Sequence, residues 1–384
     1  MTQTFTEADL VRGFLPKDDP LRQLPSEFAA LEEMARELPK ILVAASPRKL
    51  LAQLGPVPIE KLKTRAEEER AMLLLSFIGH GYVWGEKAAA PSIPASLALP
   101  WHALAKRLDR TPSLVYCSYA LHNWRRLVPS EDVKLGNIAL LQNFLAGIDE
   151  EWFVVIHVDI EALAAPAIRS LLPLQRAAQS GDTVQLRELL ERVAGCLERM
   201  NASMDRMPEN CDPYIYYNRV RPFIHGWKNN PALPQGLIYE GVTEYGGKPQ
   251  QFRGETGSQS SIVPCLDAAL GIVHKEDQLA VYLREMRDYM PKEHRAFLHE
   301  LEKAPRTREL ISAKYLQEPG VKDAFNACVQ GINRFRTTHL QYAASYIDKQ
   351  TQVDPTNPNK VGTGGTPFMV YLGKHQRETA EHLL

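Results

Sequence analysis

Apolar residues recur every three to four positions through most of this chain, and charged residues fill the other side of each repeat. Such spacing places apolar side chains on one face of an α-helix. The pattern is clearest in residues 30–45, 64–84, 183–200 and 292–304. On the polar faces, acidic residues lie one helical turn from Lys or Arg, as is typical of solvent-exposed helix surfaces. Runs of alternating β-branched residues are nearly absent, so the pattern predicts an all-α fold.

One apolar run, WFVVIHVDI at 152–160, allows two interpretations. As a buried strand it would place His157, Asp159 and Glu161 on one face, where the three could ligate a metal. The run continues directly into EALAAPAIRSLLPL, which has helical spacing, so we interpret residues 152–174 as one buried helix. Residues two apart diverge on a helix, and this interpretation disfavours a metal triad.

The length of 384 residues suggests about two domains. Glycine and acidic residues in GIDEE, at 147–151, interrupt two apolar segments and mark the expected boundary. We therefore expect a small helical domain over residues 1–147 and a larger one over 148–384. Two long polar segments, 240–261 and 349–366, are expected to be loops, and loops of this length are usually functional or disordered.

The overall charge narrows the class of partner. Lys and Arg number 45 against 46 Asp and Glu, a formal charge of −1, which argues against a general nucleic-acid binder. The five cysteines form no CxxC pair, as expected in a reducing compartment, and no CxxCH sequence would attach a haem covalently. The first residues are polar, and no apolar run is long enough to cross a bilayer. We expect a cytoplasmic protein that binds neither nucleic acid nor membrane.

Two buried polar residues are candidates for chemistry. His339 lies on an apolar helical stripe, whose members are Phe325, Cys328, Val329, Ile332, Phe335, His339 and Tyr342. A buried imidazole needs a partner, either a backbone carbonyl or a metal, and the residues alone favour the carbonyl. Arg221 lies among aromatic residues in YIYYNRVRPFIHGW and needs an anion, from a structural carboxylate or from a substrate. GTGGT, at 362–366, lacks the lysine of a phosphate loop. Its residues alone favour a flexible turn and a functional loop equally.

From about Phe77 to the C-terminus, however, the chain resembles the indoleamine 2,3-dioxygenase family. The matching stretches occur in the family's order. They are SFIGHGYVWGE, SLVYCSYALHNW, RPFIHGWKNNPALPQGLIYEG, QSSIVPCLD, MRDYMPKEHRAFLHEL, RTTHLQYAASYI and GTGGTPFMVYL. The part before Phe77 matches more loosely.

The resemblance implies one non-covalent haem b, held between helices of the larger domain, with the smaller domain capping its distal side. His339 matches the proximal ligand of the haem iron. Asp267 and Arg336 match the acid and the arginine on the proximal side, where an ion pair would orient the surroundings of the haem.

The resemblance also implies a substrate pocket. Tyr116, Phe153 and Ile224 match residues that line the distal side, and Arg221 matches the arginine that pairs with the substrate carboxylate. Thr363 matches a loop threonine that closes over the amino-acid end of the substrate, and the flanking loop is matched by Thr256 and Gly257.

His157 stands where the animal members carry a serine. The related tryptophan dioxygenases use a histidine to receive the indole N–H, so we expect His157 to position the substrate in catalysis. Further departures are Tyr119, Ala120 and Glu255, which replace a cysteine, a valine and a glycine.

The implied reaction inserts O₂ across the indole C2–C3 bond of L-tryptophan, or a related indole, and gives N-formylkynurenine. It requires O₂ and a reductant that keeps the iron ferrous. Two alternatives stay open. One is a haem oxygenase of specialised metabolism that acts on a modified tryptophan, and the other is a non-catalytic haem-binding sensor.

Overall fold

The computed structural model describes residues 9–351, 362–364 and 368–384, and it is predominantly helical. Its longest helices are α5 (Ile148–Ser180), α13 (Val321–Ala343), α6 (Thr183–Met204) and α3 (Arg65–Trp84). The shorter helices include α1 (Ala29–Leu42), α2 (Pro47–Leu51), α4 (Ala95–Arg107), α9 (Ile262–Leu270), α10 (Gln278–Arg287), α11 (Lys292–Lys303), α12 (Thr307–Leu310) and α15 (Phe368–Ala380). Strands in the described residues are two or three residues long, so the all-α prediction is confirmed.

Local sequence signals account for several helix ends. Thr64 and Glu67 form a capping box at the start of α3, with reciprocal hydrogen bonds of 3.1 and 3.2 Å between side chain and backbone. α5 begins after Gly147 and ends at Gly181, whose φ of 80° favours glycine. The run 152–174 therefore belongs to one helix, as expected. The expected loop start at Lys349 is wrong, because α14 (Lys349–Thr351) continues the helical path of α13.

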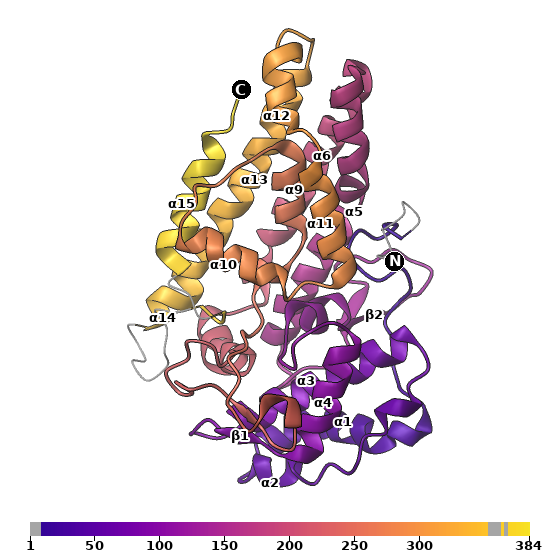
Figure 1. Ribbon diagram of the computed structural model, residues 1–384, viewed down its shortest axis with the longest axis vertical. Coiled ribbons are helices and arrows are strands. Elements are labelled where there is room, and N and C mark those ends of the chain that lie inside the picture. The colour runs from indigo at the N-terminus through magenta and orange to yellow at the C-terminus, as the bar shows by residue number, and fades with distance from the viewer. Residues whose placement is uncertain (1–8, 352–361, 365–367) are drawn as a thin grey trace.

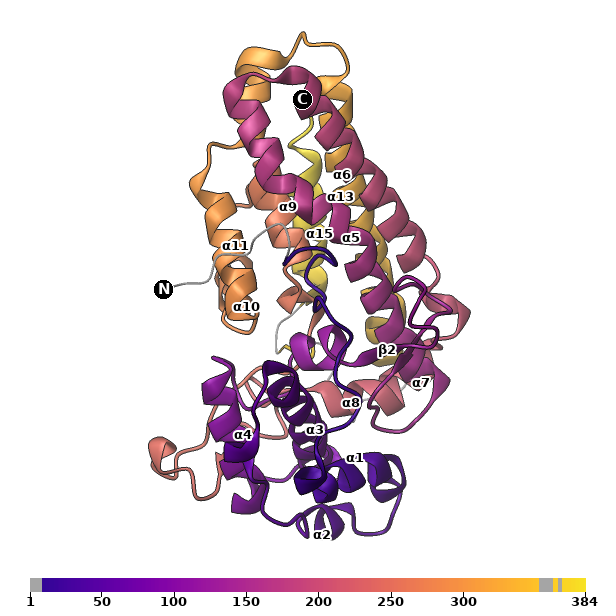
Figure 2. The same ribbon diagram turned by 90° about the vertical axis from the view of Figure 1, so that its right-hand side faces the viewer.

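The helices form two groups. α1 to α4 gather at the lower end of the molecule, and the long helices α5, α6 and α13 pack beside α15 and α9 at the upper end (Figures 1 and 2). Each group has its own apolar core.

The first core does not end at the predicted boundary at residue 147. It also takes Phe223, Trp227 and Tyr239, and Met286 of α10. A short parallel pairing of β1 (Ser92–Ile93) with β4 (Ile238–Tyr239) holds the later segment in place. An antiparallel pair, β2 (Trp124–Arg126) with β3 (Ile138–Leu140), leads into α5. The division of the chain at Gly147 stays a prediction.

His80 connects three segments that are distant in sequence. Its ring, fully buried in α3, donates from Nδ1 to the carbonyl of Phe223 at 2.8 Å. Nε2 accepts the backbone N–H of Leu114, also at 2.8 Å. Both bonds need the neutral ring, because a protonated Nε2 cannot accept. Burial lowers the pKa of His80 to about 4, even though the bond to Phe223 raises it.

This neutral histidine should make folding sensitive to acid. The folded pKa lies below the unfolded value of about 6.5, so the stabilisation is complete above that pH and is lost as the pH falls toward 4. From this shift we expect His80 to contribute about 2 kcal/mol less to the free energy of unfolding at pH 5 than at pH 8. Urea unfolding at the two pH values measures the effect.

The matched variant is His80→Gln, whose amide can make both hydrogen bonds but does not titrate. Buried acids such as Glu150 oppose the trend, because burial raises the pKa of Glu150 to about 7. The effect of His80 is therefore the difference between parent and variant in how much the free energy of unfolding changes from pH 8 to pH 5. An identical pH dependence in the two proteins would show that His80 is not the titrating group.

Candidate active site

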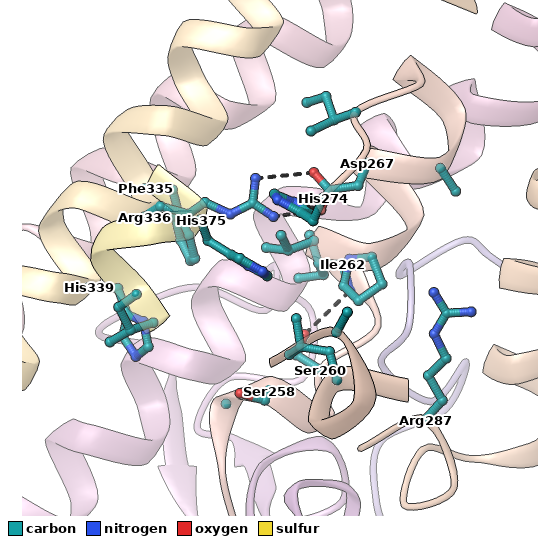
Figure 3. Close-up of a pocket in the computed structure, with 18 of the residues that line it drawn as sticks. Ser258, Ser260, Ile262, Asp267, His274, Arg287, Phe335, Arg336, His339 and His375 are labelled. Carbon is teal, nitrogen blue, oxygen red and sulfur yellow. Dashed lines mark hydrogen bonds and ion pairs between the residues drawn. The ribbon is translucent and has the colours of Figure 1, made fainter. Parts of the chain in front are cut away.

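A cavity of about 620 Å³ lies in the upper part of the molecule, between α5, α9, α13 and α15. Its volume is typical of ligand pockets, which span about 300–1,000 Å³. Figure 3 shows the residues that α9, α13 and α15 present to it. Of the expected site residues, Tyr116, His157, Gly257, Asp267, Arg336 and His339 line this cavity.

His339 projects from α13 into the cavity. The burial that the apolar stripe suggests for this side chain is not found. The stripe is buried from Phe325 to Ile332, but His339 is exposed to the cavity, because here the stripe passes from the core to the cavity wall. The surrounding protein still lowers its pKa to about 4, by burial and then by the neighbouring His157. A neutral imidazole facing a cavity is suited to ligate a metal.

His157 reaches the cavity from α5. Its Nδ1 donates to the carbonyl of Phe153, one turn earlier, at 2.7 Å. A carbonyl only accepts, so Nδ1 carries the proton and Nε2 of the neutral ring is an acceptor. Burial lowers the pKa of His157 and favours this neutral form.

The three residues considered as a metal triad, His157, Asp159 and Glu161, have different hydrogen-bond partners. Asp159 accepts the backbone N–H of Leu135 at 2.9 Å, and Glu161 accepts from Tyr116 and Ser260. The helix turns Asp159 away from His157 and Glu161, as the helical interpretation requires.

Glu161 forms a buried network that the sequence analysis did not identify. Its Oε1 accepts the Tyr116 hydroxyl at 2.9 Å and the Ser260 hydroxyl at 2.8 Å. Burial raises the pKa of Glu161 to about 7, although both hydrogen bonds lower it. The available signal was spacing, because Glu161 follows His157 by one turn of α5 and shares its side of the helix.

Arg336 and Asp267 form an ion pair on the cavity wall. The guanidinium of Arg336 donates to both carboxylate oxygens of Asp267, at 2.5 and 3.2 Å, and also to the Thr379 hydroxyl at 2.5 Å (Figure 3). Burial raises the pKa of Asp267, but Arg336 and His274 outweigh it and lower the pKa overall. The pair expected from the resemblance is present, and its role toward a haem stays a prediction.

The cavity wall has the chemical character that a haem requires. Ile156, Ile160, Ile262 and Phe335 are apolar, as a macrocycle requires, and Arg336 is a cation of the kind that a haem carboxylate requires. Among the described residues no hydrogen bond to the His339 ring is found, which leaves a ring nitrogen free for a metal.

Five expected substrate residues lie outside the wall of this cavity. They are Phe153, Arg221, Ile224, Thr256 and Thr363. Arg221, in α8 (Arg221–Ile224), is fully buried and stands over the ring of Tyr217 at 5.5 Å. Burial lowers its pKa, and Tyr216 and Tyr217 offset only part of this effect. Aromatic contacts extend from this region to the cavity, because Phe153 lies 4.7 Å from Tyr216 and 4.6 Å from His157 between ring centroids.

The two expected substrate loops meet beside α8. The backbone N–H of Gly226 donates to the carbonyl of Thr363 at 3.4 Å, and Arg253 donates to the carbonyl of Gly364. A Cβ on Gly364 would overlap the Tyr282 hydroxyl and touch Thr256, so this close approach requires glycine. The last two residues of GTGGT and residues 352–361 lie outside the described residues. The expected closing of this loop over the substrate therefore also lies outside them.

The three further residues that depart from the animal pattern are all buried. Tyr119 is buried, with its ring 6.4 Å from that of Phe153, and Ala120 is buried beside it. Glu255 is also buried, which raises its pKa to about 8. At neutral pH the carboxyl of Glu255 is therefore largely protonated.

Comparison with known proteins gives one consistent result. The indoleamine 2,3-dioxygenase family matches residues 6–382. Rat indoleamine 2,3-dioxygenase 1 is 33% identical over 95% of this chain and 92% of its own. Human indoleamine 2,3-dioxygenase 2 is 31% identical over 97% of this chain and 93% of its own. A Fusarium equiseti protein named 6-hydroxytryptophan 2,3-dioxygenase is 31% identical over 97% of this chain and 96% of its own. No described helix is long and apolar enough to cross a membrane.

The Arg336–Asp267 pair should contribute far more to stability than an exposed pair on the same helix. Asp267→Asn leaves a guanidinium only 10% exposed without its counter-charge, which should cost about 3 kcal/mol. Asp205→Asn is the matched control, because it removes the partner of Arg334 where both side chains are about half exposed, and it should cost about 0–1 kcal/mol. Urea unfolding compares the two variants, and equal costs would contradict the assignment.

Proposed function

The chain belongs to the indoleamine 2,3-dioxygenase family, and we propose that it inserts both atoms of O₂ across the indole C2–C3 bond of L-tryptophan to give N-formylkynurenine. Dioxygenases of this family depend on haem. The observation that supports the proposal best is the cavity, which presents to one space the acceptor nitrogen of His157 and the ring of His339, which has no partner among the described residues.

We propose non-covalent haem b as the cofactor, with His339 as its iron ligand. Arg336 would pair with a haem carboxylate while Asp267 holds the guanidinium in position. When bound, the haem supplies the oxygen chemistry, and a reductant is needed to keep the iron ferrous. The apolar wall at Ile156, Ile160 and Phe335 would exclude water from the reacting groups.

His157 would position the indole ring. Its Nε2 is an acceptor, because Nδ1 donates to Phe153, and an indole N–H is a donor only. Tyr116 lines the same cavity, held by its hydrogen bond to Glu161. An edge-to-face contact between Tyr116 and His157, 6.0 Å between ring centroids, limits the positions open to the imidazole.

The amino-acid end of the substrate would lie toward α8. Arg221 is the cation for the carboxylate, since its planar guanidinium can form two parallel hydrogen bonds. Ile224, at the end of the same helix, would give an apolar contact to the indole. Thr256, Gly257 and Thr363 belong to the two adjoining segments and would bound this end of the site.

A modified tryptophan is a second candidate substrate. Tyr119 adds a polar group near Phe153, Glu255 adds a second buried one close enough to Tyr119 to influence it electrostatically, and the Fusarium equiseti relative is named for 6-hydroxytryptophan. A non-catalytic sensor is disfavoured, because a sensor has no need of a carboxylate-binding arginine.

The purified, reduced protein should convert L-tryptophan to N-formylkynurenine. Under ¹⁸O₂ gas, mass spectrometry of the product before exchange should find two labelled atoms. Acidic organic solvent should remove the haem from the protein, since no thioether holds it. Rates with 6-hydroxytryptophan, measured in parallel, distinguish the two substrate candidates.

His339→Ala is the control for this experiment. It should abolish product and change the absorption spectrum of the bound haem. One labelled atom per product would identify a monooxygenase. An unchanged spectrum in His339→Ala would remove His339 from the iron, and turnover of 6-hydroxytryptophan alone would favour the second substrate.

Arg221→Ala should weaken the binding of tryptophan about ten- to hundred-fold, because a charge-assisted pair contributes about 1.5–3 kcal/mol. Indole, which has no carboxylate, should lose much less. The matched control is Arg219→Ala, since Arg219 is two residues away and exposed. Spectroscopic titration of the haem protein measures both ligands, and equal losses for tryptophan and indole would make Arg221 structural.

His157→Ser should retain measurable activity, because His157 is proposed to position the ring and not to act as an obligate base. The parent should bind tryptophan about two- to ten-fold better than 1-methyltryptophan, which lacks the indole N–H. This preference should shrink in His157→Ser. A variant that still binds haem and tryptophan but has no activity would require an acid–base role for His157.

A further inference from the structure

A cluster of potential metal ligands lies where α15 passes the end of α9. His375 and Glu378 are three apart on α15, so they face the same side of the helix. His274 reaches them from the segment after Gly271, whose φ of 83° ends α9. One donor atom from each of the three residues lies within 4.8 Å of the other two. Figure 3 shows His274 and His375 side by side.

The spacing within the cluster suits coordination. His274 Nδ1 and Glu378 Oε2 are 3.0 Å apart. Two donors on one tetrahedral zinc ion, each about 2.0–2.1 Å from the metal, lie roughly 3.3 Å from each other. The rings of His274 and His375 are stacked, with centroids 3.9 Å apart and planes 12° from parallel. Because an imidazole coordinates in the plane of its ring, one of the two rings must turn out of this stack before both can direct a nitrogen at one ion.

The cluster also contains a buried nitrogen whose hydrogen-bonding capacity is unused. His375 is 8% exposed and Glu378 is 4% exposed. Within the described residues, His375 Nε2 has no hydrogen-bond partner, whereas Glu378 Oε1 is ion-paired with Lys374 Nζ at 3.3 Å. Burying an unsatisfied polar atom is costly, so a wall built only for packing would not hold His375 this way.

Asp267 supports the same interpretation from outside the cluster. Its Oδ2 lies 3.4 Å from His274 Nε2. With Nδ1 toward the metal, His274 would donate Nε2–H to this carboxylate, and carboxylates commonly orient metal-bound histidines in this way. The charged groups around the cluster are Asp267, Glu378 and Asp277 against Arg336 and Lys374, which leaves an excess of negative charge.

We propose that His274, His375 and Glu378 bind one divalent zinc-type ion, separate from the haem. Two imidazoles and a carboxylate match the borderline character of Zn²⁺, and water would complete a tetrahedral shell. His274 and His375 line the cavity and Glu378 does not, so the ion lies within the cavity wall. It fastens α15, which follows the substrate loop, to the end of α9.

The test uses the full-length, untagged, haem-loaded protein, treated with chelator and then dialysed against zinc chloride. Elemental analysis of the dialysed protein should find one zinc per chain. His375→Ala and Glu378→Gln should each bind zinc at least about tenfold more weakly, since changing even an outer-shell partner has that effect. The matched control is His299→Ala, an exposed histidine of α11, which should still bind one zinc.

A second measurement covers the case in which His375→Ala does not fold. Zinc should raise the melting temperature of the parent and of His299→Ala, but not that of Glu378→Gln, which keeps the size of the side chain. The absence of stoichiometric zinc in the haem-loaded parent would overturn the proposal. So would equal zinc content in parent and Glu378→Gln, or uptake by the haem-free protein alone, which would assign the cluster to the haem carboxylates. Tryptophan turnover is not part of the readout, so this result is independent of the proposed reaction.

Discussion

The neutral ring of His80 is the constraint on which the arrangement of the substrate side depends. One nitrogen donates to Phe223 in α8 and the other accepts from Leu114, two residues before Tyr116. The ring therefore fixes the segments that carry Arg221 and Tyr116 relative to α3 and to each other. A protonated His80 would lose one of these bonds, so the positions of both candidate substrate residues depend on one buried imidazole remaining neutral.

Close backbone contact also fixes the segment 252–259 relative to α8. Gly226 and Gly254 approach so closely that a Cβ on either would overlap the backbone of the other segment. The contact is sealed by hydrogen bonds from Glu255 N to Ile224 O at 3.1 Å and from Trp227 N to Phe252 O at 2.9 Å. Gln259 then bonds Gly254 through its amide N–H and accepts the backbone N–H of Tyr116, each at 2.9 Å. The path leads from α8 back to the cavity wall through buried groups, so each segment limits the movement of the next.

The sequence predicted what local spacing determines. The helix over 64–84 and the helical course of residues 152–174 follow from residues within a few turns, and so does the divergence of Asp159 from His157 and Glu161. The opening of the His339 stripe onto a cavity could not be predicted, because it depends on how α5, α9 and α15 pack around α13. The same holds for Tyr239 and Met286 in the first core, which join it through contacts between distant segments. The resemblance supplied candidate roles for Arg221 and Thr363, but their separation from the main cavity wall became visible only in three dimensions.

The charged and uncharged groups of the cavity lie on different sides, and this asymmetry fits the proposal that one space accepts both a haem and an indole. On the α5 side, burial lowers the pKa of His157, which favours the neutral ring, and raises the pKa of Glu161 to about 7, so that this carboxyl is about half protonated at neutral pH. On the α13 side Arg336 and Asp267 are both charged, because each stabilises the charge of the other in their ion pair. A neutral aromatic ring with one N–H donor suits the first side, where a charged ligand would meet a large desolvation cost. An amphipathic macrocycle with carboxylates suits the second, where Arg336 can satisfy an anion and His339 faces the same space. In the proposed function, the protonation states that burial favours would therefore direct the indole to the α5 side and the haem carboxylates to the α13 side.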